Sequence, residues 1–127
     1  MHQIIATDRA PLPVGPYAQA VQAGNMVFIS GQIPLSPETG LLAGPDLISQ
    51  TRQVFANLQA VIEACGCTVS QVVKTTVFMI DLDEFSDFNK LYVEWMGSHT
   101  PARSTVQVAA LPRGVRIEVE AILVKES

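Results

Sequence analysis

Residues 47–80 read LISQTRQVFANLQAVIEACGCTVSQVVKTTVFMI and contain the two elements that decide the fold. From Leu47 to Cys65, apolar residues recur every three or four positions, which is the spacing of one buried helix face. Gly66 follows, and glycine readily adopts the left-handed backbone that ends a helix. The run Val72–Ile80 is rich in β-branched residues and predicts a strand with apolar side chains on both faces.

A β-hairpin is predicted upstream of this helix. Residues 18–22 alternate in part, residues 26–33 are β-branched and aromatic, and Gly24-Asn25 lies between them as a turn. Residues 36–45 contain prolines and glycines among polar residues and predict a surface loop that leads to Asp46 as a helix cap. A strand, a helix and a strand in this order predict a right-handed crossover to a parallel neighbour.

A second helix is predicted after the strand. Asp81 or Asp83 can cap it, and Gly97 can end it. Its apolar residues share one face and are Phe85, Phe88, Leu91, Tyr92, Trp95 and Met96.

The last part of the chain predicts a second hairpin. It consists of Arg103–Val108, a turn at 111–114, and strict apolar and polar alternation over Val115–Val124. Two amphipathic helices can cover one face of a single sheet. We therefore expect a two-layer α+β fold, with both helices on one face of a mixed sheet, in one domain over residues 1–127.

The composition predicts self-association. Hydrophobic residues make up 48% of the chain and charged residues 16%, where about 25% charged is usual. Two helices leave the other sheet face uncovered, although its strands carry apolar side chains. We expect that face to pack against other copies of the chain.

The charge and the chain start exclude other classes of protein. The formal net charge is −4 and no basic run is present, so nucleic acid is not an expected partner. No segment approaches the ~18 continuous apolar residues of a membrane span. Residues 1–9 lack the features of a signal peptide, so we expect a cytoplasmic protein that does not bind membranes.

Metal and redox sites are not expected. Cys65 and Cys67 flank one glycine, a spacing that suits neither a zinc site nor a CxxC pair, so we expect reduced thiols. His2 and His99 are far apart and have no metal-ligand spacing around them.

Arg103 lies in the segment PARSTV, between small residues and an apolar strand. It is either a surface charge at a strand end or an anchor for an anion. Guanidinium supports the second interpretation because its planar donor pair matches a carboxylate.

Glu120 has a similar ambiguity. In the last strand it shares a face with Arg116 and Glu118, which is typical of a half-buried strand. The next residue on that face, Ile122, is apolar, so water could be excluded around Glu120. A carboxyl group in such a place can exchange protons near neutral pH.

Other polar positions carry weaker signals. Tyr17 follows Gly15-Pro16 and fits a packed turn. Ser30-Gly31 interrupts an apolar strand, which marks either a bulge or the close approach of a ligand. Asn89 is off the apolar stripe of its helix, and this pattern favours an exposed polar residue.

Taken together, six fragments from about Ile5 to Val124 resemble the reactive-intermediate deaminase (RidA, YjgF) family in order and spacing. The C-terminal fragments are the most diagnostic. The fragments are GPY (15–17), SGQIP (30–34), KTTVF (74–78), PARS (101–104), VAALP (108–112) and IEVEA (117–121).

The resemblance implies a chorismate-mutase-like fold that assembles as a homotrimeric barrel with three inter-subunit clefts. It also implies the hydrolysis of enamines and imines such as 2-aminoacrylate, that is, 2-iminopropanoate and 2-iminobutanoate deaminase activity, to a 2-keto acid and ammonia without a cofactor or metal.

Roles for individual residues also follow from the resemblance. Arg103 would bind the substrate carboxylate, and Glu120 would activate the attacking water. Ser30 and Gly31 would line the pocket, which Tyr17 and Asn89 would complete, Tyr17 from across the subunit boundary. Many members carry cysteine where this chain has Thr105, so thiol-dependent regulation is in doubt here, but Thr105 can still donate to the carboxylate.

Two alternatives stay open at this point. A non-catalytic metabolite-binding trimer would need Arg103 but not Glu120. A ribonuclease or translation inhibitor is an activity attributed to some relatives, and the acidic composition argues against it.

Overall fold

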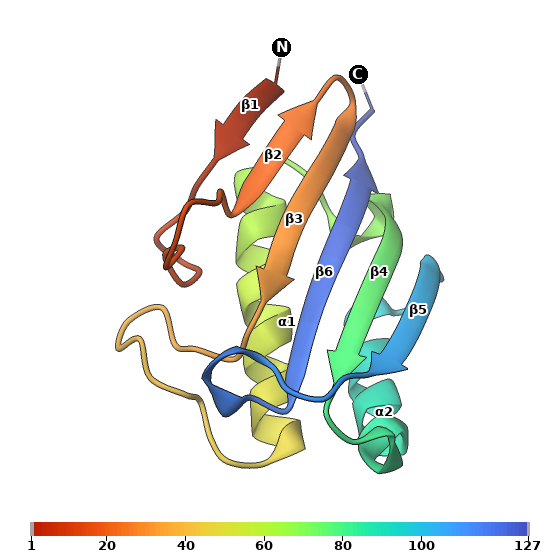
Figure 1. Cartoon of the computed structure of the whole chain (residues 1–127). Helices are drawn as coiled ribbons and strands as arrows, with labels where there is room; N and C mark the ends of the chain where they lie inside the picture. The colour runs from red at the N-terminus through yellow and green to blue at the C-terminus, as the bar shows by residue number, and fades with distance from the viewer. Residues whose placement is uncertain (1, 127) are drawn as a thin grey trace.

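The computed structural model describes residues 2–126 as one six-stranded sheet with two helices on one side (Figure 1). The helices are α1 (Leu47–Ala64) and α2 (Phe85–Met96). This arrangement confirms the predicted two-layer α+β fold with a mixed sheet. The strands are β1 (His2–Ile5), β2 (Ala20–Ala23), β3 (Met26–Gln32), β4 (Val72–Met79), β5 (Ala102–Gln107) and β6 (Ile117–Val124).

The sheet order is β1-β2-β3-β6-β4-β5, and of its pairs only β4 with β5 is parallel. The β2–β3 hairpin is as predicted, with Ala23 opposite Met26 across the turn. The short edge strand β1, which pairs with β2, was not predicted from the sequence.

The predicted second hairpin is wrong. β6 does not pair with β5 but lies between β3 and β4, antiparallel to both. The physical reason is burial: Ile117, Val119 and Leu123 are 0% exposed, and a strand buried in this way is favoured in the centre of a sheet.

The predicted crossover also needs correction. β3 and β4 run in the same direction, because each is antiparallel to β6, but β6 separates them. The neighbouring parallel pair is β4 with β5, and α2 connects these two strands.

Local signals explain α1. Its N-cap is Asp46, as predicted, whose carboxylate accepts a hydrogen bond from the Ser49 N–H at 3.0 Å. Gly66, with φ +74°, follows the helix end in the left-handed conformation. The face that carries Val54, Leu58 and Val61 is fully buried.

The start of α2 differs from the prediction. Asp81 caps a short 3₁₀ turn at Leu82–Glu84, where its carboxylate accepts from the Asp83 N–H at 2.9 Å, and neither aspartate caps α2 itself. The helix has Glu84 at its N-cap position and ends at Gly97. Within residues 2–126, no helix combines the length and the apolar character that crossing a bilayer would need.

Gln19 fixes the segment that connects β1 to β2. Its side chain is 2% exposed. Its Oε1 accepts from the Thr7 N–H at 2.7 Å, and its Nε2 donates to the carbonyls of Thr7 and Pro11 at 3.0 and 2.8 Å. One buried amide therefore satisfies several backbone groups of a segment that has no helix or strand of its own.

We expect Gln19→Leu to lower the free energy of unfolding by about 2 kcal/mol, because backbone groups around it lose their partners. Gln22→Leu is the matched control, since the Gln22 amide makes one exposed hydrogen bond, to the Gly24 carbonyl. Urea denaturation at equal protein concentration measures both. Equal midpoints for the two variants would contradict the prediction.

Candidate active site

Arg103 lies on edge strand β5 and faces the helices. Its guanidinium carbon is 4.6 Å from the ring centre of Tyr92 and 5.2 Å from that of Phe85. Its Nη1 donates to Oδ1 of Asn89 at 2.9 Å. In residues 2–126 it forms no ion pair with a carboxylate. Donors on its edge therefore remain available to an anion.

Thr105 follows two residues later on the same face of β5. Its Oγ1 is buried and has no hydrogen-bond partner. Thr105 and Arg103 line one cleft with Leu82 and Phe85. Because a buried polar group without a partner costs about 1–3 kcal/mol, this hydroxyl suits a ligand that hydrogen-bonds beside Arg103.

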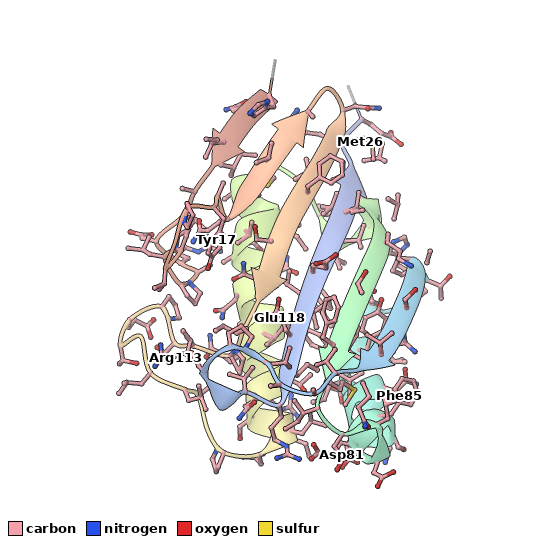
Figure 2. All side chains as sticks on the ribbon, in the orientation of Figure 1. Tyr17, Met26, Asp81, Phe85, Arg113 and Glu118 are labelled. Atoms are coloured by element: carbon pink, nitrogen blue, oxygen red, sulfur yellow. The ribbon has the colours of Figure 1, made fainter. Side chains whose placement is uncertain are left out.

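A second cleft, of about 360 Å³, lies at the end of β3. It contains Tyr17 and Gly31, which the sequence predicted to be in one pocket, together with Pro112 and Arg113. Arg113 has φ +62°, a left-handed conformation in the turn that approaches the cleft. In Figure 2, Tyr17 and Arg113 lie to the left of the sheet and Phe85 lies to the right, next to α2.

Ser30 has a structural contact in this chain. Its Oγ donates to the Ala18 carbonyl at 2.6 Å and so ties β3 to the segment before β2. The pairing of β3 with β6 is irregular between Ile29 and Gln32, as a β-bulge would produce. Of the two interpretations of Ser30-Gly31, the bulge agrees with this shift in the pairing of β3 with β6.

Glu118 lies against Gly31. A Cβ added to Gly31 would collide with Oε2 of Glu118 and would lie 2.8 Å from its Cδ. Burial, and then the negative charge of Glu120, raise the pKa of the Glu118 carboxyl group. Its raised pKa and its place beside Gly31, which lines the second cleft, make Glu118 a candidate for proton transfer.

Glu120 lies on the same face of β6, opposite Thr76 of β4. Glu120 was preferred to Glu118 in the prediction because the apolar Ile122 follows it on that face, although the strand spacing places both carboxylates alike. What distinguishes Glu118 from Glu120 is that Gly31 lies against Glu118, a contact that depends on how β3 pairs with β6. Glu118 is thus the candidate that sequence reasoning missed.

The two groups lie on opposite faces of the sheet. Arg103 pairs with Thr75, whose side chain is buried under the helices, whereas Glu118 pairs with Phe78 on the open face. Strand β4 also separates β5 from β6. Within one chain the predicted site residues therefore form two separate groups, one around Arg103 and one around Gly31.

Among the described residues, no cysteine or histidine lines either of these two clefts. Burial is the main cause that raises the pKa of the Cys65 thiol to about 11, so its reactive thiolate form is disfavoured. His99 bonds through Nε2 to the Val72 carbonyl at 2.7 Å. Residues 2–126 contain no cluster of three or more His, Cys, Asp or Glu that could hold a metal.

Known proteins match the chain along nearly its whole length. The model of the family described as Endoribonuclease L-PSP matches residues 7–125. The 2-iminobutanoate/2-iminopropanoate deaminase of Salmonella typhimurium is 48% identical, over 98% of this chain and 99% of that protein.

Two solved structures are also similar. RidA from the Antarctic bacterium Psychrobacter sp. PAMC 21119 has a TM-score of 0.93 at 46% identity, covering 96% of this chain and 98% of that one. TdcF of Escherichia coli with bound serine has a TM-score of 0.93 at 44% identity, covering 98% and 99%. The chain therefore belongs to the YjgF/RidA family, whose family model is described as Endoribonuclease L-PSP.

Proposed function

We propose that this chain is an imine deaminase that converts 2-iminopropanoate, 2-iminobutanoate and their enamine tautomers into 2-keto acids and ammonia, without a cofactor. The observation that carries the proposal is the Arg103 guanidinium, which has no carboxylate partner in residues 2–126 and lies beside the unpartnered Thr105 hydroxyl. The name of the Salmonella relative supports the choice of substrate. Such imines come from pyridoxal-phosphate enzymes acting on serine or threonine, so we assign the activity to the cytoplasm.

The proposed chemistry needs an anion anchor and one group that moves protons. The enamine first takes a proton from solvent at C3 and becomes the protonated imine. Water then adds to C2, and the carboxylate base accepts the water's proton. The base passes this proton to nitrogen, the C–N bond breaks and ammonia leaves, and the hydroxyl releases its proton to solvent to give the keto group, which balances the proton taken up at C3. Each step is a proton transfer or an addition that a carboxyl group can assist.

We assign the anchor to Arg103 with Thr105, and the base to Glu118. Glu118 is favoured over Glu120 by its contact with Gly31 and by its raised pKa. Glu120 stays the alternative base, because it lies on the same strand face. Tyr17 and Gly31 would border the reacting carbon, and Asn89 supports Arg103 through its 2.9 Å hydrogen bond.

We further propose that the site forms between two copies of the chain in a homotrimer. Arg103 and Glu118 occupy opposite sheet faces, so one substrate can contact both only where a neighbour contributes the second half. The open face carries the partly exposed Phe28 and Met26, and apolar surface of this kind suits contact with another copy. The serine bound to TdcF carries the same carboxylate and a nitrogen on C2.

An RNA-cleaving activity is the second candidate, because the family model is described as an endoribonuclease. A net charge of −4 offers no field that would attract a phosphate backbone. Salt-dependent binding of RNA by the purified chain would favour this candidate over the deaminase.

Arg103→Ala should abolish deamination of 2-aminoacrylate generated in place by a serine dehydratase, and Arg103→Lys should recover little activity. Lysine keeps the charge but loses the planar donor pair. Release of the 2-keto acid above the spontaneous rate is the measurement. Wild-type activity in Arg103→Lys would mean that charge attraction alone is sufficient.

Glu118→Gln should lower kcat by about 10²–10⁴-fold, because glutamine cannot take up a proton. The carboxylate is the active form and its pKa is raised above 4.5, so wild-type activity should fall as pH decreases through that raised value. Glu120→Gln is the matched control: it should keep most activity and move this acid limb to lower pH, since the Glu120 charge contributes to the shift. A large loss in Glu120→Gln alone would transfer the base role to Glu120.

Chains with Arg103→Ala and chains with Glu118→Gln should complement each other when they are assembled together. In a trimer with three inter-subunit clefts, equal mixing restores both residues in about one quarter of the clefts. Activity of the coexpressed mixture, with light scattering to give the assembly mass, is the measurement. A monomer at micromolar concentration, or a mixture as inactive as its parents, would rule out the shared site.

A further inference from the structure

One face of α2 provides the hydrogen bond and the two cation–π contacts of the Arg103 side chain within residues 2–126. Phe85, Asn89 and Tyr92 follow each other at spacings of four and three residues, which aligns them along the helix. The guanidinium carbon lies over the rings of Tyr92 and Phe85, and Asn89 accepts from one nitrogen. An aromatic ring attracts the cation without accepting its N–H groups as a carboxylate would, so these rings hold Arg103 without replacing a substrate carboxylate.

Tyr92 is itself fixed in place. Its hydroxyl lies 2.7 Å from Oγ1 of the buried Thr75 on β4. Its ring also packs at 5.6 Å from the ring of Phe88 and, edge-on, at 6.2 Å from that of Phe55. Thr75 is the residue directly paired with Arg103 in the parallel β4–β5 ladder. The aromatic ring and the backbone of Arg103 are thus both attached to the same position of β4.

We propose that Tyr92 is a positioning residue of the site, whose ring, fixed through Thr75, holds the Arg103 guanidinium in the orientation that binds the substrate carboxylate. This inference rests on the proposed function, because it takes Arg103 as the carboxylate anchor. Arginine has several rotatable bonds, and ordering it before the substrate arrives removes part of the entropic cost of binding. Tyr92 does not contact the reacting atoms and acts through Arg103.

The test measures pyruvate binding by calorimetry on the full-length assembled protein, together with KM and kcat for imine hydrolysis. Tyr92→Leu removes the ring and should raise both Kd and KM by about 5- to 30-fold, with a much smaller change in kcat. Tyr92→Phe keeps the ring but loses the bond to Thr75, and should raise Kd by about 2- to 5-fold.

Phe88→Leu is the matched control. Phe88 lies in the same helix, is 0% exposed and packs on the Tyr92 ring, but within residues 2–126 the cation–π contacts of Arg103 are with Phe85 and Tyr92. It should lower the unfolding midpoint and leave Kd and KM near the wild-type values. An equal rise in Kd for Phe88→Leu and Tyr92→Leu would reduce Tyr92 to a packing residue and overturn the proposal.

A double variant shows whether Tyr92 acts through Arg103. In an Arg103→Lys background, Tyr92→Leu should add less than about 2-fold to the Kd for pyruvate, because no planar guanidinium remains to be oriented. Full additivity would overturn the proposal. Should Arg103→Ala bind pyruvate as wild type does, the carboxylate anchor itself would be wrong. Should Arg103→Ala weaken binding while Tyr92→Leu does not, only the role of Tyr92 would be lost.

Discussion

The register of β6 is the constraint on which the rest of the structure depends. Its side chains alternate, so Ile117, Val119 and Ala121 enter the core under the helices while Glu118 and Glu120 point to the open face. A slip of one residue against β3 or β4 would put both carboxylates in the apolar core and expose the fully buried residues. The core therefore specifies the position of the acidic side chains: the same apolar burial that stabilises the sheet holds Glu118 beside Gly31.

Local features of the fold were predictable and non-local ones were not. The repeat over residues 47–65 and the cap at Asp46 involve neighbours a few positions apart, and the structure has both. The partner of a strand is a long-range choice. The alternation of Val115–Val124 shows that one face is buried, but it does not say whether β6 joins β5 or enters between β3 and β4. Only the packing of all six strands under two helices decides this.

The site shows the same division. Arg103 and Gly31 could be predicted because each lies in a short fragment, PARS or SGQIP, that resembles the family. Glu118 and Glu120 could not be separated, because they share a strand face and differ only in their relation to Gly31 on another strand. Tyr92 was predicted as part of an apolar stripe, which is true of its ring, while its contact with Arg103 depends on β5 lying beside β4.

The separation of Arg103 from Glu118 has an electrostatic consequence for the proposed function. Two opposite charges on one face, within contact distance, would form an ion pair, and a substrate would have to break that pair before it could bind. Here the sheet itself lies between them. The guanidinium carbon lies over aromatic rings of α2, and the Glu118 carboxyl group is half-buried on the open side, where burial raises its pKa. Neither group has an ion-pair partner within residues 2–126. In the proposed trimer, a substrate carboxylate satisfies the cation of one copy while the carboxyl group of the next stays free to move protons.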